Sequence, residues 1–341
     1  MDEMKKYEMI TRYLERLILT EKIKVGEKLP SENDISKQFG VTRMTVRRAL
    51  LELEKKGLIF KIRGLGTFVS SDDLLSTRRI GVLARSPTIV FGIVKTCTAL
   101  GIKCYVEDTG QDVTSEIRGL KHLLEHKIDG LIIEPRAFTV ENHVFHRLVN
   151  ASFPVVFVDR LVEGYTDIPT VLSDNYLGAS LLAKHMKERH KSNNAVFVTF
   201  EGVNISSVKE RYEGICEQFK QKIEVVEVDG LQGDFLPLLD LVKTRNIDTI
   251  FFCNDFLAVR GLGYLLKSGL KVPEDVKVVG FDDEPVSALT IPELTTVKQD
   301  LEQVGSLAVL TLVKLIKGES VGKLLRIKTE LVIRKSCGCN L

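Results

Sequence analysis

The stretch LPSENDISKQFGVTRMTVR, residues 29–47, decides how the N-terminal part of this chain folds. Ser31 precedes a short helical pattern that stops at Gly40, as expected for a serine N-cap and a glycine at the opposite end. Thr42 begins a second helix, in which Val46 and Ala49 belong to one apolar face. The stretch therefore predicts two short helices joined by a tight turn.

The flanking residues complete a small module. An apolar stripe between Met4 and Leu19 predicts a preceding helix, and residues 58–63 and 67–69 read as two strands around a turn at residues 64–66. The order helix, helix, helix, hairpin is that of a winged helix-turn-helix. We therefore expect an α+β winged helix-turn-helix domain over residues 1–70.

The exposed side of this module has polar and basic side chains that can bind DNA. A recognition helix enters the major groove with its N-terminal residues against base edges, and arginine can bond guanine bidentately. The candidate contacts on the second helix of the turn are Thr42, Arg43, Thr45 and Arg47. The hairpin tip adds one cation on a slim backbone, through Arg63, Gly64 and Gly66. A solvated basic helix would explain one arginine, but not the whole arrangement.

The charge distribution supports the same partner. Residues 1–70 hold 15 Lys and Arg against 10 Asp and Glu, whereas the rest of the chain holds 33 against 36. Residues 1–70, the head, are basic, whereas the rest of the chain, the body, is mildly acidic. This difference suggests that only the head binds a polyanion. We expect double-stranded DNA as the partner of residues 1–70.

Beyond a polar linker at residues 71–78, the pattern of apolar residues changes. Short β-branched runs alternate with helical stretches, which predicts βαβ units and an open α/β sheet. The runs cover residues 80–83, 130–133, 155–158, 195–200, 249–252 and 276–281.

Polar residues follow several of these runs. In open α/β sheets, ligands bind at the carboxyl ends of the strands. Asp159, Asn254 and Asp282 stand at such ends, and Arg211 could add a charged donor for sugar hydroxyls. Each could instead cap a helix: for Asp255 capping is as plausible as binding, and Asp174 is read as a cap.

Residues 7–69 resemble the winged-helix domain of the GntR family. The resemblance rests on residues 29–32, 39–47, 57–59 and 64–69. It implies that Glu32, Arg43, Thr45, Arg47 and the wing at residues 63–66 touch DNA. Many members carry arginine where this chain has Asn33, which leaves the contact at that position open.

The body resembles the LacI-type regulator core, which shares the fold of periplasmic sugar-binding proteins. The motifs lie at residues 129–132, 154–159, 211–214, 254–258, 272–283, 294–297 and 334–337. The resemblance implies a two-lobed effector-binding and dimerisation domain over residues 79–341, with crossings between lobes near residues 160, 290 and 325. It also implies that Asp159, Arg211, Asn254 and Asp282 bond the effector.

The start of the body departs from this pattern. The loop between residue 83 and a helix expected around residues 94–100 is unusually short, and we expect Arg85 or Phe91 to provide the first-loop contact. A GntR-type head on a LacI-type body resembles the arabinose-repressor subfamily. We expect a cytoplasmic, homodimeric repressor of sugar-utilisation genes that binds a palindromic operator and is released by a small sugar.

Three alternatives stay open at this stage: a non-sugar ligand or corepressor, a sugar sensor with impaired DNA binding, and an enzyme. The sequence shows no phosphate loop or nucleophile elbow, and we expect no catalytic residue, cofactor or metal. Cys337 and Cys339 form a C-x-C pair, but a metal site would need two more ligands, and none is evident. His122 and His126 have helical metal spacing without a third ligand.

Overall fold

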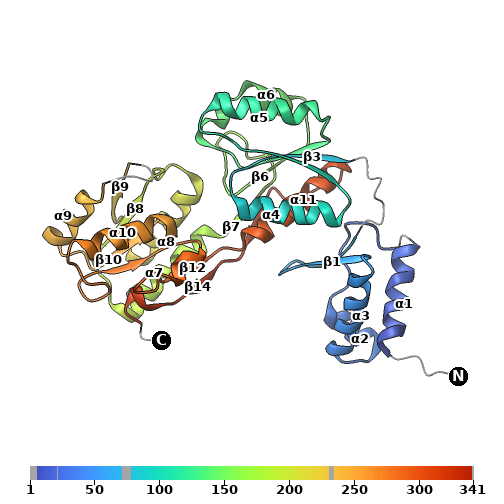
Figure 1. Ribbon diagram of the computed structural model, residues 1–341, viewed down its shortest axis with the longest axis horizontal. Coiled ribbons are helices and arrows are strands. Elements are labelled where there is room, and N and C mark those ends of the chain that lie inside the picture. The colour runs from blue at the N-terminus through green and yellow to red at the C-terminus, as the bar shows by residue number, and fades with distance from the viewer. Residues whose placement is uncertain (1–5, 21, 71–77, 230–233, 340–341) are drawn as a thin grey trace. The chain divides into compact units, whose positions relative to one another are not determined.

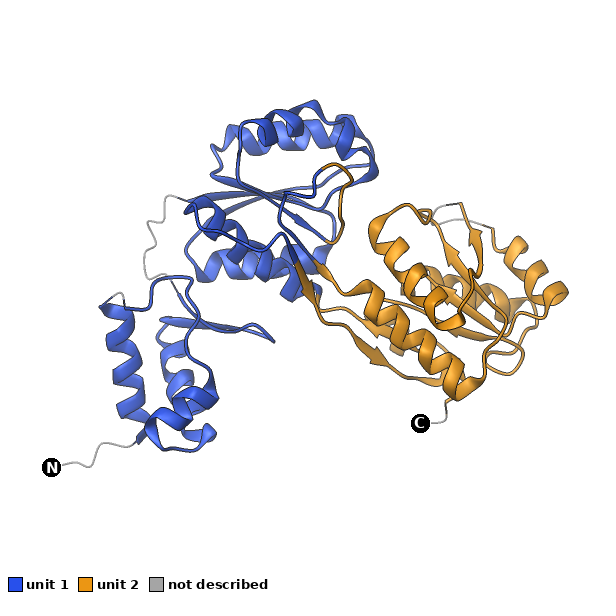
Figure 2. Cartoon of the chain, turned by 180° about the vertical axis from the view of Figure 1, so that it is seen from behind, with its two compact units in different colours: residues 1–158, 165–171, 301–324 blue, residues 159–164, 172–300, 325–341 orange. Residues whose placement is uncertain are grey.

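A computed structural model describes residues 6–20, 22–70, 78–229 and 234–339, so the expected linker lies outside the described residues except for its last position. The chain divides into two compact units, coloured separately in Figure 2. Unit 1 comprises residues 1–158, 165–171 and 301–324, and unit 2 comprises residues 159–164, 172–300 and 325–341. No helix in the described ranges combines the length and apolarity required to cross a membrane.

The N-terminal module of unit 1 has the expected order of elements. It consists of α1 (Lys6–Leu19), α2 (Glu32–Phe39), α3 (Arg43–Lys55), β1 (Ile59–Ile62) and β2 (Gly66–Val69). The two strands pair antiparallel, with Ile59 opposite Val69. A core from all three helices and the hairpin, which includes Leu14, Ile35 and Leu53, fixes their packing. The prediction of a winged helix-turn-helix is confirmed.

The rest of unit 1 is built around a parallel sheet. Its elements are β3 (Arg79–Leu83), α4 (Pro87–Ala99), β4 (Lys103–Glu107), α5 (Val113–Glu125), β5 (Gly130–Ile133), η1 (Ala137–Glu141), α6 (His143–Asn150), β6 (Val155–Val158) and α11 (Leu301–Ile316). The strand order is β13-β7-β6-β5-β3-β4, and β7 (Thr170–Ser173) and β13 (Leu324–Ile327) run across the boundary between the units. Figure 1 shows α5 and α6 on one face of this sheet and α4 and α11 on the other.

Unit 2 repeats the α/β plan with a smaller sheet of order β11-β10-β8-β9. Its elements are α7 (Asn175–His190), β8 (Ala195–Thr199), α8 (Ser206–Phe219), β9 (Glu224–Glu227), α9 (Leu236–Arg245), β10 (Thr249–Phe252), α10 (Asp255–Lys267), β11 (Lys277–Val279), η3 (Pro285–Ala288), β12 (Thr296–Lys298), β14 (Glu330–Val332) and η4 (Lys335–Cys337). The paired strands of this sheet are parallel, and β12 pairs antiparallel with β14.

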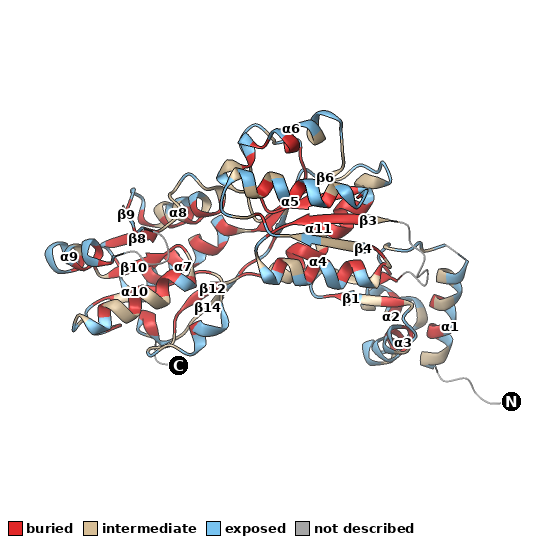
Figure 3. Cartoon of the chain, turned by 45° about the horizontal axis from the view of Figure 1, so that its top comes forward, coloured by how far each residue is buried: buried red, intermediate tan, exposed pale blue. Residues whose placement is uncertain are grey.

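The β-branched runs of the sequence are the central strands of both sheets. Every residue of β5, β6, β8 and β10 is buried, as Figure 3 shows by the red strands. This burial explains why their sequences are continuously apolar. The predicted α/β body is confirmed, although the edge strands β4 and β9, which are partly exposed, were not predicted.

The chain passes between the units after residues 158, 164, 171, 300 and 324. The expected crossing near residue 290 thus falls at residue 300. The reason is that the segment before residue 300 still belongs to unit 2, where β12 pairs with β14 and Thr295 bridges to Val279. A ladder of hydrogen bonds holds this segment in place until α11 begins.

Two glycines bring α4 and α11 into close contact. A Cβ added at Gly92 would lie 2.1 Å from the Glu302 carbonyl oxygen, and one added at Gly305 would lie 2.1 Å from the Ile89 carbonyl oxygen. Because each helix offers a glycine where the other presents its backbone, the two helices pack closer than side chains would allow. A helix from the C-terminal fifth of the chain thereby completes unit 1.

Candidate DNA interface and ligand site

The turn between α2 and α3 is formed by the residues that the sequence indicated. The Ser31 hydroxyl accepts a hydrogen bond from the Asp34 backbone N–H at 3.2 Å, and the Asp34 carboxylate accepts from the Ser31 backbone, which completes a capping box. Gly40 ends α2 in the left-handed conformation, with φ 60°. Thr42 caps α3 by accepting from the Thr45 N–H at 3.3 Å. These caps fix the direction in which α3 starts.

The N-terminal end of α3 presents an exposed polar face. Arg43 and Arg47 are exposed, while Val46 and Ala49 on the opposite face are fully buried. Met44 is also exposed, at 69%, and was missed by the sequence reasoning. An apolar side chain in this position could contact a thymine methyl group.

Two predicted DNA contacts pair with each other. The Glu32 carboxylate accepts from Arg47 Nε at 2.8 Å and lies 3.3 Å from Lys61 Nζ. Partial burial opposes ionisation of Glu32, but the hydrogen bonds from Arg47 and Lys61 prevail and lower its pKa. Glu32 thus holds the Arg47 guanidinium in one orientation at the surface of the module.

The remaining predicted contacts surround this face. Asn33 is exposed at the start of α2, beside Glu32. Arg63 and Gly64 are exposed at the tip of the hairpin, and Gly64 and Gly66 have φ values of 70° and 122°, which a β-carbon would disfavour. The hairpin tip thus requires both glycines.

A second group of predicted residues meets in unit 2. Asp159 follows β6 and Asp282 follows β11, and both have positive φ, 69° and 125°. A non-glycine residue in such a conformation stores strain and is typical of functional sites. Arg211 projects from α8 and places its Nη1 3.5 Å from the Asp282 carboxylate.

Arg211 is held from four sides. Its Nε donates to Asn175 Oδ1 at 2.9 Å, its Nη1 donates to the Cys253 carbonyl at 2.6 Å, and its guanidinium lies 4.0 Å from the centre of the Phe281 ring. Only 7% of Arg211 is exposed. The guanidinium is therefore a fixed part of the unit, aimed at Asp282.

Asp282 is the most perturbed carboxyl of this group. Burial raises its pKa to about 7, in spite of Arg211, and Asp255 adds to the effect. Its Oδ1 accepts from Gln299 Nε2 at 2.6 Å. The neighbouring Asp283 points elsewhere and accepts from Arg334 at 2.6 Å, as expected for adjacent carboxylates on a loop.

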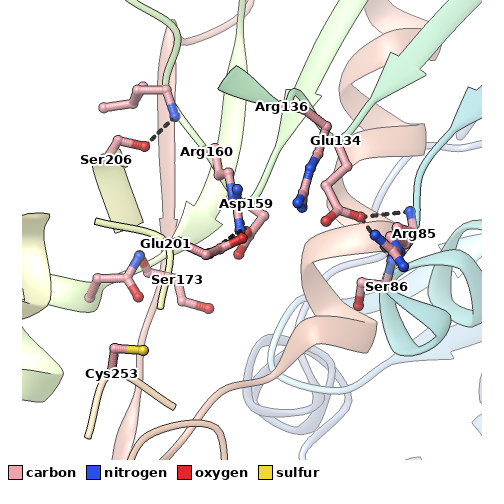
Figure 4. A network of polar contacts seen from close by, with 12 residues as sticks. Arg85, Ser86, Glu134, Arg136, Asp159, Arg160, Ser173, Glu201, Ser206 and Cys253 are labelled. Carbon is pink, nitrogen blue, oxygen red and sulfur yellow. Dashed lines mark hydrogen bonds and ion pairs between the residues drawn. The ribbon is translucent and has the colours of Figure 1, made fainter. Parts of the chain in front are cut away.

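A network beside this pair joins Asp159 and Arg160, which follow a predicted strand, to Glu201, which the sequence reasoning did not single out. Arg160 lies 3.3 Å from Asp159 and donates to Glu201 at 2.7 Å. Figure 4 shows these three side chains pointing toward one another, with Ser173 nearby. The only sequence signal for Glu201 is that it closely follows the buried strand β8, a criterion that the sequence reasoning applied to other strands.

Two polar atoms at this site have no hydrogen-bond partner in the described chain. They are the Ser173 hydroxyl oxygen and the Gln299 amide oxygen, and both are buried. Buried polar atoms in folded proteins nearly always have partners, so both oxygens can accept a hydrogen bond from a bound molecule. Gln299 is the residue that also bonds Asp282.

The structure shows which of the candidate residues of unit 2 cap helices. Asn254 caps α10, because its Oδ1 accepts from the Leu257 N–H at 2.9 Å, and Asp174 caps α7. Asp255 is neither a cap nor exposed: its carboxylate accepts from Glu284 N at 3.0 Å and from Ser287 Oγ at 2.6 Å. Asp255 therefore ties the loop after β11 to α10.

The two first-loop candidates lie in unit 1. The Arg85 backbone N–H donates to the buried Glu134 carboxylate at 2.8 Å, as does that of Ser86. Figure 4 shows the Arg136 side chain directed at the same carboxylate. Glu134 was not predicted, although it directly follows β5.

Phe91 lies within a helix instead of on the expected loop. Because Ser86 caps α4 and Pro87 occupies its first turn, this helix begins well before residue 94. Phe91 is 58% exposed, and its ring lies 5.8 Å from Lys95 Nζ on the same helix. The Ser-Pro pair was the signal that the sequence reasoning overlooked.

Comparison with known proteins agrees with both modules. Residues 6–69 match the bacterial regulatory proteins of the gntR family, and residues 183–337 match a periplasmic binding protein-like domain. The chain is 30% identical to the arabinose metabolism transcriptional repressor of Geobacillus stearothermophilus, over 97% of both chains. It is 24% identical to the repressor of the same name from Halalkalibacterium halodurans, over 92% of this chain and 90% of that protein.

A solved structure shows the fold of the body. A LacI family transcriptional regulator from Enterococcus faecalis with bound ribose matches with a TM-score of 0.66 and 24% identity, covering 76% of this chain and 98% of that one. At this identity the likeness concerns the fold alone.

Proposed function

Because this chain belongs to the family of transcriptional repressors in which a gntR-type winged helix is joined to a LacI-type core, with arabinose metabolism repressors among its relatives, we propose that a pentose sugar controls its hold on an operator. The chain is a repressor of sugar metabolism and not an enzyme. The proposal concerns which residues read DNA, which ligand binds, and in which direction it acts.

The observation that carries the DNA half is the exposed N-terminal end of α3. Arg43 is free of ion pairs among the described residues, whereas Arg47 is oriented by Glu32. We assign base readout to Arg43 and Arg47, with Thr45 and the wing at Arg63 as phosphate or groove contacts.

The test replaces Arg43 by alanine and measures binding by fluorescence anisotropy. Arg43→Ala should cost about 1–3 kcal/mol on the operator and relax base preference at one position. Lys55→Ala, at the far end of the same helix and exposed, is the matched control and should change operator affinity little. An equal loss for Arg43→Ala on operator and random DNA would contradict the readout role.

The ligand half rests on the charge balance of the unit 2 cluster. Asp159, Arg160 and Glu201 neutralise one another in part, and Arg211 faces Asp282. No cation is in surplus for a phosphate, while several carboxylate and amide oxygens remain to accept hydroxyl protons. This chemistry favours a neutral polyol, and the relatives make arabinose the first candidate.

Isothermal calorimetry with the full chain tests the ligand. Arabinose should release heat and saturate at one molecule per chain, ribose should bind more weakly, and a sugar phosphate should not bind. Glu201→Gln should weaken the binding at least tenfold, since it loses a charged hydrogen bond. Glu188→Gln, on the exposed surface of α7, is the control. Unchanged affinity in Glu201→Gln would place the sugar elsewhere.

Linkage limits how a sugar can control operator binding. A sugar can shift operator affinity only by its differential affinity for the two functional states. We propose that arabinose lowers operator affinity and that two chains bind a palindromic operator in the cytoplasm, with half-sites about one helical turn apart or a multiple of it. Anisotropy with added sugar separates the outcomes, because a corepressor such as a purine would raise the affinity instead.

A further inference from the structure

Four potential metal ligands meet at the C-terminal end of unit 2, outside the cluster around Asp282. They are His185 and His190, at the end of α7, and Cys337 and Cys339, from the C-terminal segment. One ligand atom from each residue lies within 4.8 Å of the other three. The C-x-C pair, which had no visible partners in the sequence, thus acquires two imidazoles from a helix about 150 residues earlier.

Four of the six separations between these ligand atoms match a tetrahedral site, and the other two are within 4.8 Å. Zinc–nitrogen bonds of about 2.0–2.1 Å and zinc–sulfur bonds of about 2.3 Å give tetrahedral N–N and N–S separations of about 3.3 and 3.6 Å. The His185 and His190 Nε2 atoms are 3.2 Å apart. Cys339 Sγ lies 3.4 Å from His190 Nε2, and both sulfurs lie 3.7 Å from His185 Nε2. Each of these four separations is within about 0.2 Å of the tetrahedral value.

The backbone holds the two cysteines in position. Ser336, next to Cys337, donates its hydroxyl to the Val278 carbonyl at 2.6 Å and accepts from the Thr295 N–H at 2.8 Å. Gly338 has φ 94°, a conformation that a side chain would strain, and its N–H bonds the Lys335 carbonyl. This turn directs Cys337 and Cys339 toward the same point.

We propose that unit 2 binds one zinc ion through His185, His190, Cys337 and Cys339. Two thiolates and two imidazoles are a donor set typical of zinc, and four protein ligands leave no open position for substrate. The site is therefore structural. Bound zinc fastens the C-terminal segment to the end of α7 and adds a contact that an apolar core does not provide.

Cobalt is the direct probe of this site. The full chain, prepared without metal and with reduced thiols, is titrated with Co²⁺. We expect the visible absorption of a tetrahedral cobalt ion and a sulfur-to-cobalt charge-transfer band, both saturating at one ion per chain and both abolished by added Zn²⁺. Zinc affinity then follows from competition with a chromophoric chelator.

Variants of one ligand at a time locate the ion. Because replacing a residue that only hydrogen-bonds a metal ligand already weakens metal binding about 10–100-fold, loss of a ligand in Cys339→Ser or His190→Gln should weaken zinc binding at least 100-fold. Cys216→Ser and His122→Gln change a thiol and an imidazole far from the cluster in sequence and should leave the affinity unchanged.

Three results would overturn the proposal. One is the absence of a charge-transfer band in the reduced wild-type chain, which needs no variant to be informative. The second is cobalt binding that survives both ligand variants. The third is a Cys337–Cys339 disulfide that forms in the presence of excess zinc. None of these measurements involves sugar or operator DNA, so the outcome is independent of the proposed function.

Discussion

Replacing Arg211 by methionine tests the centre of the proposed ligand site. Methionine keeps much of the length of the side chain and removes the guanidinium. That group donates to Asn175 at 2.9 Å and to the Cys253 carbonyl at 2.6 Å, and it faces Asp282 at 3.5 Å. Each of these partners would lose this charged donor, while Asp282 would keep the neutral Gln299 amide as a donor.

The expected cost follows from burial. Arg211 is 7% exposed, so water cannot replace the lost contacts. Removing the guanidinium leaves two buried acceptors, Asn175 Oδ1 and the Cys253 carbonyl, without this donor, and leaving a buried polar group unsatisfied costs about 1–3 kcal/mol. Asp282→Asn alone should cost less, since a carboxyl whose pKa is about 7 is already half protonated near neutrality. The double variant has no buried charge at this position. We therefore expect its loss of unfolding free energy to be about 1–3 kcal/mol smaller than the sum of the losses in the two single variants.

Urea unfolding followed by far-ultraviolet circular dichroism measures these differences, with binding to random DNA as a check that the N-terminal module is folded. Sugar calorimetry on the same variants separates stability from ligand recognition. A loss below about 1 kcal/mol for Arg211→Met, together with additive effects in the double variant, would mean that the guanidinium is not a buried partner of Asp282.

Further predictions concern the head, the ionisation of Asp282 and the helix contact in unit 1. Glu32→Gln should release Arg47 from its ion pair and remove a negative charge that repels phosphates. Affinity for random DNA should therefore rise, and the ratio of operator affinity to random-DNA affinity should fall. An unchanged ratio would contradict the role of Glu32 in orienting Arg47. Because burial raises the pKa of Asp282 to about 7, against about 3.9 in an unfolded chain, its contribution to stability is complete below about pH 4 and is lost as pH rises through 7. The wild type should therefore lose about 1.4 kcal/mol between pH 6 and 8 relative to Asp282→Asn, and parallel pH profiles would refute this. Gly92→Ala should lower the free energy of unfolding by about 1–3 kcal/mol, because the added β-carbon overpacks the helix contact. Gly263→Ala is the control, since its β-carbon meets nothing within 4 Å and should be neutral or stabilising. Thermal denaturation compares the two variants, and equal effects would contradict the close helix contact.

The sequence predicts the DNA-reading head nearly to the residue, because its signals are local. The cap at Ser31 and the turn at Gly40 depend only on neighbouring residues, and both are found as expected; Thr42, expected to begin the next helix, is its N-cap. The central strands are equally readable, since full burial leaves continuous apolar runs.

Other features depend on residues distant in the chain, and the sequence does not reveal them. Arg160 and Glu201 meet although 41 residues separate them, and Glu134 binds a loop almost 50 residues earlier. Asp255 resembles a cap in the sequence, yet its partners at Ser287 and Thr296 make it a tie between loop and helix. Contacts between such distant residues leave no periodic pattern in the sequence, because they arise from the order of strands in the sheet.

The glycine contact between α4 and α11 has a consequence for synthesis of the chain. The head is complete once residue 70 has been made, whereas α4 lacks its partner helix α11 until residues 301–316 emerge from the ribosome. Contacts between segments so far apart form late, and until then α4 presents an uncovered apolar face to chaperones and proteases. A chain that terminates prematurely between these points would carry a finished DNA-reading module on a core that cannot close. We expect such truncations to be degraded quickly, and those that survive would compete for the operator without any response to sugar.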